Sequence, residues 1–216
     1  LWYGVTVENG RVIEVDLLNN NLDGALPDDW YNLTALRHIQ LIGNNVIGEL
    51  LPEIQNLTEL ASLELSHTNL GGEIPVELFQ CDKLFEFRIG ECNFFGTIDA
   101  GICNLDYLIE VDFSQNNFDP ESSCEALNCL VSNNANFHGD QLQRQQDGTS
   151  LFGACGIMPS AEPVLEQDSL ALVALYDSTG GDFWTNNDYW KSEYPVALWY
   201  GVTVENGRVI GLNLGN

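Results

Sequence analysis

Basic residues are scarce in this chain of 216 residues. Seven Lys and Arg stand against 32 Asp and Glu, and the formal net charge is -25 at pH 7. Such a charge repels the phosphate backbone of nucleic acids and the anionic surface of membranes. The sequence therefore predicts neither nucleic acid nor a membrane surface as a direct partner, and the acidity is interpreted mainly as a well-solvated surface.

Motifs for catalysis are also lacking. GxSxG, HExxH, GxxxxGK[ST] and GxGxxG are all absent, so the sequence predicts no enzyme activity, no cofactor and no metal site. The oxygen-rich segment TGGDFWTNND, 179–188, does not have the spacing of an EF-hand loop and is interpreted as a turn. The sequence shows no signal peptide and no membrane span.

Cysteines are few and even in number, and they lack CxxC spacing or a set of His partners. A zinc site is therefore not expected, and disulfides are. Two sequons for N-glycosylation, at Asn32 and Asn56, agree with an oxidising compartment. Together these features predict an extracellular or cell-surface glycoprotein. The six cysteines are Cys81, Cys92, Cys103, Cys124, Cys129 and Cys155.

A repeat of 24 residues runs through residues 12–118 over five turns without insertion. Its apolar positions have the spacing LxxLxLxxNxL, which puts the inner face of one short strand on a core before a sharp turn. One coil cannot bury its own apolar face, so stacked coils must form a solenoid. The first and third apolar columns are Val12, Leu36, Leu60, Leu84 and Leu108, and Leu17, Leu41, Leu65, Ile89 and Phe113.

A polar column occupies the Asn position of the repeat. Its side chains are expected to bond the buried backbone of the turn, with Thr68 a weak substitute and Cys92 a small buried thiol that fits the space. The column consists of Asn20, Asn44, Thr68, Cys92 and Asn116.

The repeats resemble the plant-type subclass of the leucine-rich repeat family. LDGALPDDWYNLTAL at 22–36 and LGGEIPVELFQCDKL at 70–84 match its LxGxIPxxLxxLxxL phrase, whereas Asp99 and Leu51 depart at the Pro position. The resemblance implies an α/β solenoid, a right-handed coil with a parallel sheet on the concave face and short helical turns on the convex face. It also implies a second short strand in each LxGxIP segment.

Residues 119–155 are interpreted as a worn terminal coil with a cystine-stapled C-terminal cap, and the proline-bearing segment 156–167 as a linker. At least one pair among Cys124, Cys129 and Cys155 should lock this end, although fifteen pairings are possible. Cys81 and Cys103 lie two places out of register on adjacent coils, close enough to bridge.

Residues 168–216 are predicted to be another cap followed by a first strand. Asp168 or Ser169 can cap a helix that Gly180 or Gly181 ends, and the Trp-rich segment after it supplies apolar surface. This part is similar to the N-terminal caps of bacterial and algal leucine-rich repeat proteins.

The opening residues LWYGVTVENGRVI, 1–13, return without a substitution at 198–210. Residues 1–11 are therefore interpreted as the end of an equivalent cap. On this interpretation the chain is a window, slightly longer than one unit of about 197 residues, cut from a tandem array. The expected partners are neighbouring copies of the same module, arranged head to tail.

Two functions from different classes fit these features. The first is a structural extracellular glycoprotein whose capped solenoids form a filament or cell-surface stalk. The alternative is a receptor-like or inhibitor-like ectodomain that binds peptide or polysaccharide on the concave face. The candidate ligand residues on that face are basic, although nearby carboxylates favour internal charge balancing. They are Arg37, His38, His67 and Arg88.

Overall fold

The structure is a computed structural model that describes residues 2–133, 135–137, 143–157, 165–187, 190–191, 196, 199–205 and 208–214. The chain forms two compact units, Leu1–Ile157 and Met158–Asn216. The first is a leucine-rich repeat solenoid, and each unit is described here by itself.

A sheet of seven strands lines one side of the solenoid in the order β1-β2-β4-β6-β8-β10-β12. Strands β1 and β2 form an antiparallel hairpin, and each later strand pairs in parallel with the strand before it in this order. From β2 to β10 the register shifts by one repeat per strand, so Val15 lies beside Ile39 and Ile39 beside Leu63. The strands are β1 (Val5–Glu8), β2 (Arg11–Asp16), β4 (His38–Gln40), β6 (Ser62–Glu64), β8 (Glu86–Arg88), β10 (Glu110–Asp112) and β12 (Asn136–Phe137).

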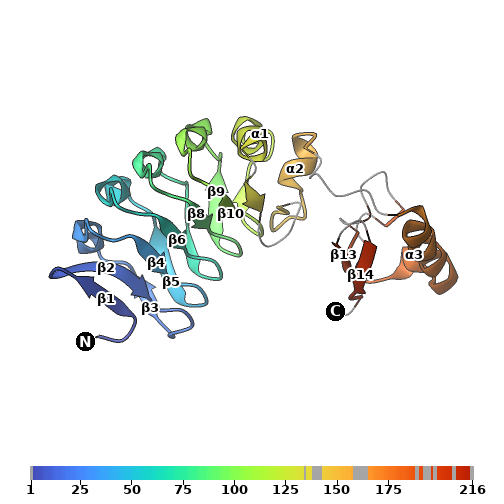
Figure 1. The fold of residues 1–216 in the computed structure, drawn as a ribbon, viewed down its shortest axis with the longest axis horizontal. Helices are drawn as coiled ribbons and strands as arrows, with labels where there is room; N and C mark the ends of the chain where they lie inside the picture. Colours follow the sequence, from blue (N-terminus) through green and yellow to red (C-terminus); the bar gives the residue numbers. More distant parts are fainter. Residues whose placement is uncertain are drawn as a thin grey trace. The chain divides into compact units, whose positions relative to one another are not determined.

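The structure contains the second short strand that the LxGxIP phrase implies. These strands form a parallel sheet, and after β3, β5, β7 and β9 the chain enters a 3-10 helix. The helices follow one another along the outer edge of the arc (Figure 1). The strands are β3 (Asp23–Ala25), β5 (Asn45–Glu49), β7 (Asn69–Gly72), β9 (Asn93–Gly96) and β11 (Asn117–Phe118), and the helices are η1 (Asp28–Asn32), η2 (Pro52–Asn56), η3 (Val76–Gln80) and η4 (Ala100–Asn104).

The predicted apolar columns form the core. Leu36, Leu60 and Leu84 are fully buried, as are Leu41 and Ile89 in the neighbouring column. The first members of both columns, Val12 and Leu17, are only half-buried. Each coil is thus covered by the next, and the first coil lacks such cover on one side within the described residues.

From Asn44 onward the polar column bonds the turns as expected, whereas Asn20 in the first coil is exposed. The Asn44 amide donates to the Leu17 and Leu41 carbonyls at 2.8 Å each, and its oxygen accepts from the Leu22 amide at 2.9 Å. Cys92 fills the space and also forms hydrogen bonds, because its thiol lies 3.3 Å from the Leu65 carbonyl and 3.4 Å from the Thr68 hydroxyl. Side chains of this column therefore tie neighbouring coils together.

The far end of the solenoid is closed by helices α1 (Cys124–Ser132) and α2 (Leu151–Ala154). The segment interpreted as a worn coil thus carries an α-helix in place of a 3-10 turn, and β12 then extends the sheet. One disulfide joins Cys103 of η4 to Cys129 of α1, and another joins Cys124 to Cys155.

The expected bridge between Cys81 and Cys103 is wrong, because Cys81 is a buried free thiol. Cys81 occupies the position of Leu57 and Leu105 in the adjacent coils, so its side chain points into the core. Its thiol donates to the Ile54 carbonyl at 3.5 Å. Cys103 lies at another position of its coil, at the 3-10 helix, where it meets α1 instead.

The second unit contains α3 (Glu166–Thr179), η5 (Gly181–Phe183), β13 (Val202–Glu205) and β14 (Arg208–Leu212). Gly180 ends α3 with a left-handed φ of 69°, as predicted. The helix begins at Glu166 without a side-chain cap, and Asp168 instead binds Arg208. A cluster of aromatic rings from α3 and the following turns packs on the β13–β14 hairpin.

Candidate ligand-binding surface

Two columns of outward side chains cover the seven-stranded sheet from β2 onward. They alternate with the buried column of Val15, because successive residues of a strand point to opposite faces. The first column is Glu14, His38, Ser62, Glu86, Glu110 and Asn136, and the second is Asp16, Gln40, Glu64, Arg88 and Asp112.

Six of these eleven side chains are acidic, and Arg88 is the one arginine or lysine among them. Its guanidinium lies 2.9 Å from a carboxylate oxygen of Glu86, 3.6 Å from Glu110 and 3.8 Å from Glu64. One positive charge is therefore shared among three negative ones, and the surface keeps an excess of negative charge.

The pKa of Glu64 on this surface is raised above its ordinary value. Burial against the neighbouring strands is the main cause, and the Glu86 carboxylate adds repulsion, while the Gln40 amide at 3.0 Å opposes the shift. A positive charge brought to this surface would relieve the repulsion. A hollow of about 130 Å³ lies over these residues and His38.

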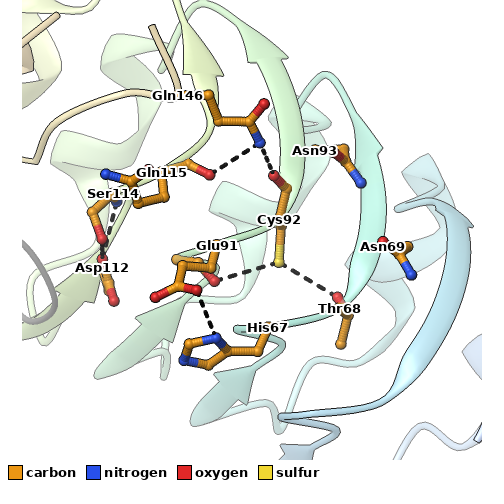
Figure 2. A pocket seen from close by; sticks show the side chains of 11 residues that line it. His67, Thr68, Asn69, Glu91, Cys92, Asn93, Asp112, Ser114, Gln115 and Gln146 are labelled. Atoms are coloured by element: carbon orange, nitrogen blue, oxygen red, sulfur yellow. Dashed lines mark hydrogen bonds and ion pairs between the residues drawn. The ribbon is translucent and has the colours of Figure 1, made fainter. Parts of the chain in front are cut away.

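A larger groove of about 590 Å³ lies where the chain leaves the strands, between the sheet and the polar column. Gln146 lies at one end of it (Figure 2). Its side-chain amide donates to the Cys92 carbonyl at 2.8 Å and to the Gln115 carbonyl at 3.3 Å. Its lining residues are His67, Thr68, Asn69, Gly90, Glu91, Cys92, Asn93, Asp112, Ser114, Gln115 and Gln146.

Part of this groove is built from residues in a left-handed backbone conformation that recurs with the repeat. Asn19, Gly43, His67, Glu91 and Gln115 hold φ between 50° and 71° at equivalent positions. The conformation lets each amide reach the next coil, as from His67 to the Gly90 carbonyl at 2.9 Å. It is unfavourable for His, Glu and Gln, and strained residues often cluster at ligand sites. Of these five residues, only Gly43 and Asn19 are of types that favour a left-handed backbone, so the sequence alone could not reveal that the conformation recurs.

The four basic candidates do not form one cluster. His38 and Arg88 lie on the sheet, whereas Arg37 precedes β4 and binds Glu8 at 3.1 Å. His67 lies beyond β6, where its Nδ1 meets Glu91 at 3.0 Å (Figure 2). Arg37, His67 and Arg88 each have an acidic partner, and the two arginines balance only part of the local negative charge, so the surface stays acidic.

The predicted glycosylation residues occupy the convex side. Asn32 and Asn56 are the last residues of η1 and η2, and both are exposed. Their side chains are thus accessible at equivalent places on adjacent coils.

The described residues contain no group of three or more His, Cys, Asp or Glu side chains arranged to hold a metal ion. None of the helices among them is both long and apolar enough to cross a bilayer.

No protein-family model matches the chain, and no curated protein matches its sequence. Solved structures do. The BIR2 ectodomain from Arabidopsis thaliana is 28% identical with a TM-score of 0.52, over 54% of this chain and 63% of that one. The ectodomain of the Arabidopsis receptor kinase GASSHO1/SCHENGEN3, in complex with CASPARIAN STRIP INTEGRITY FACTOR 2, is 29% identical with a TM-score of 0.57, over 63% of this chain and 16% of that one.

The Arabidopsis SOBIR1 ectodomain, 21% identical with a TM-score of 0.55, matches 63% of this chain and 78% of its own, and supports the fold alone. The chain spans 63% of the BIR2 ectodomain and a smaller share of GASSHO1/SCHENGEN3. With the geometry above, these likenesses show that the chain has the leucine-rich repeat solenoid fold of plant receptor ectodomains.

Proposed function

We propose that this chain is an extracellular recognition module that binds a positively charged peptide segment along its acidic sheet and the adjoining groove. The excess of carboxylates in the two outward columns is the observation that carries the proposal. Charged groups on such a surface select a partner of opposite sign and speed its approach. No catalytic role is assigned to the chain.

The geometry of the columns supports an extended ligand. Neighbouring strands lie about 5 Å apart, so the carboxylates form rows along the solenoid axis. The groove adds polar side chains and backbone carbonyls beside these rows. The structure of GASSHO1/SCHENGEN3 in complex with CASPARIAN STRIP INTEGRITY FACTOR 2 adds support by analogy, since the folds are alike.

Calorimetry with two synthetic peptides tests the proposal. Both are about twelve residues long, and alternate positions carry lysine in one and glutamate in the other. The lysine peptide is expected to bind, and its affinity should fall as salt screens the charges. The Glu14→Gln/Glu110→Gln double variant should bind it about three- to tenfold more weakly.

A matched control removes two carboxylates from the convex side. Asp28→Asn/Glu53→Gln makes the same change in net charge on exposed residues of η1 and η2 and should leave the affinity unchanged. If both double variants lose affinity equally, only net charge matters and the proposed surface is wrong. Binding of the glutamate peptide with equal affinity contradicts the proposal as well.

An extracellular location agrees with the two disulfides, which persist in oxidising compartments. Asn32 and Asn56 are accordingly proposed to carry N-linked glycans on the convex side, away from the ligand. Mass spectrometry of protein secreted from eukaryotic cells, before and after glycosidase treatment, measures occupancy at each site. Unmodified asparagine at both positions would contradict this assignment.

A filament or cell-surface stalk of tandem units is the second candidate function. The observation that favours it is the repeated sequence at residues 1–13 and 198–210. In this arrangement 1–11 complete a cap, 12–118 form the repeats, 119–155 close the solenoid, 156–167 link units, and 168–216 begin the next one. Imaging of two joined units by electron microscopy separates a regular linear particle from units that tumble independently.

A further inference from the structure

The repeated sequence folds into the same hairpin twice. Both β1–β2 and β13–β14 are antiparallel, and their registers shift at equivalent places, Thr6/Val7 and Thr203/Val204. Gly4 and Gly201 hold φ of 71° and 74°. The Gly4 carbonyl accepts from Asp16 at 2.7 Å, and the Gly201 carbonyl accepts from Asn213 at the same distance. A surface that fits one hairpin therefore fits the other.

The two hairpins differ sharply in burial. Trp199 is 5% exposed, whereas its counterpart Trp2 is 83% exposed, and Tyr3 is exposed to the same extent. Trp199 is covered by Trp190, whose ring centroid lies 5.2 Å away and whose Nε1 donates to the Tyr200 carbonyl at 3.0 Å. The cover of the second hairpin thus comes from the segment that precedes it, and the described residues supply no equivalent cover for the first.

A polar contact fixes the helix on the second hairpin. One Asp168 oxygen accepts from the Arg208 Nε at 2.9 Å and from the Val209 amide at 3.0 Å. The Arg208 guanidinium, in turn, holds the pKa of the Asp168 carboxyl below its ordinary value. Arg208 and Val209 correspond to Arg11 and Val12 in the repeated sequence. The first hairpin therefore has the same two residues that donate to Asp168 in the second unit.

We propose that the exposed face of the β1–β2 hairpin, formed by Trp2, Tyr3, Val7 and Arg11, is a docking site for a second copy of the cap segment, residues 165–197. On docking, the copy of Trp190 would cover Trp2, and the copy of Asp168 would bind Arg11, which now contacts Thr34. The same cover would reach Val12, which is half-buried and whose counterpart Val209 packs against the aromatic cluster of the second unit. Units of this kind then stack head to tail without closing on themselves.

The test joins a copy of residues 165–197 directly before Leu1 of the full chain. Because residues 1–13 repeat residues 198–210, the junction reproduces the sequence that continues from the natural cap. Hydrogen exchange read by mass spectrometry follows the amides of residues 2–8. These amides are expected to exchange at least about tenfold more slowly than in the unextended chain.

Two variants of the extended chain serve as controls. Asp168→Ala/Trp190→Ala, made only in the added copy, removes both contacts and should return exchange to the rate of the unextended chain. Arg11→Glu leaves the added copy intact and should weaken protection, while residues 202–205 of the natural hairpin keep their protection.

Equal exchange of residues 2–8 in the unextended, extended and doubly substituted chains overturns the proposal. Gain of helix in the circular dichroism spectrum of the extended chain without protection of residues 2–8 also overturns it. Protection of residues 2–8 in the unextended chain that grows with protein concentration would also support the proposal, because the cap segment of a separate molecule would then occupy the same site. None of these outcomes depends on peptide binding by the acidic sheet.

Discussion

Replacing Gln115 with glycine is expected to stabilise the solenoid, although it removes a side chain from the groove. Gln115 holds φ at 54°, in the left-handed region. This conformation costs a residue with a Cβ about 1 to 2 kcal/mol. Glycine adopts this conformation without that cost. Its larger loss of conformational entropy on folding, however, costs about 0.5 to 1 kcal/mol relative to alanine. The difference lies between about 0 and 1.5 kcal/mol, so the expected gain in the free energy of unfolding is about 0.75 kcal/mol.

Chemical denaturation followed by circular dichroism measures this gain, and Gln115→Ala is the matched control. Alanine also removes the side-chain amide of Gln115 but keeps the Cβ. The free energy of unfolding of Gln115→Ala should therefore stay within about 0.5 kcal/mol of that of the unsubstituted chain. The reverse change tests the same position in an earlier coil. A Cβ at Gly43 would lie 2.0 Å from the Asn19 side-chain oxygen, so Gly43→Ala should destabilise the solenoid.

The reasoning is refuted if the glycine variant is no more stable than the alanine variant. The left-handed column would then carry no strain, and its polar side chains would need no functional explanation. If the glycine variant is more stable and also binds the lysine peptide more weakly, the strain is retained in exchange for ligand contacts.

Three further predictions concern the core and the acidic sheet. Leu65→Ala should lower the free energy of unfolding by about 2 to 5 kcal/mol, because the side chain is buried between stacked coils; urea titration checks this. Burial raises the pKa of Cys81 to about 11, so the thiols of Cys81 and Cys92 should resist iodoacetamide at neutral pH until the protein unfolds, as mass spectrometry would show. Folding raises the pKa of Glu64. Its contribution to the free energy of unfolding is therefore fully present at low pH, where the carboxyl is protonated, and is lost as the pH rises through the raised pKa. Glu64→Gln should therefore stabilise the protein at about pH 7 and have little effect at about pH 4, and an equal effect at both would contradict the cause given.

Most of the solenoid could be predicted from the spacing of the repeat. Alternating apolar residues at a fixed period leave a short strand only one way to bury its face, so columns such as Leu36, Leu60 and Leu84 followed from spacing alone. The Asn position was equally readable, because a buried turn needs a side chain that both donates and accepts hydrogen bonds.

Distances between side chains of neighbouring coils could not be predicted from the repeat spacing. Whether a cysteine meets another depends on side-chain direction, and Cys81 points into the core while Cys103 meets Cys129 on a helix that replaces the repeat. Beyond the regular repeats, the Gln145 amide bonds the Phe113 carbonyl at 3.1 Å and its oxygen accepts from Phe118 at 2.9 Å. Because this role of Gln145 has no fixed spacing, it could not be predicted from the sequence.

The charge of the sheet shows the same division. The sequence determined that acidic residues outnumber basic ones and which positions of each strand point outward, because both follow from composition and from alternation along a strand. Only the tertiary structure decided that Arg88 is shared among Glu64, Glu86 and Glu110, and that His67 lies in the groove. Electrostatic partners are set by distances of a few ångströms between different coils, and these exist only once the coils are stacked.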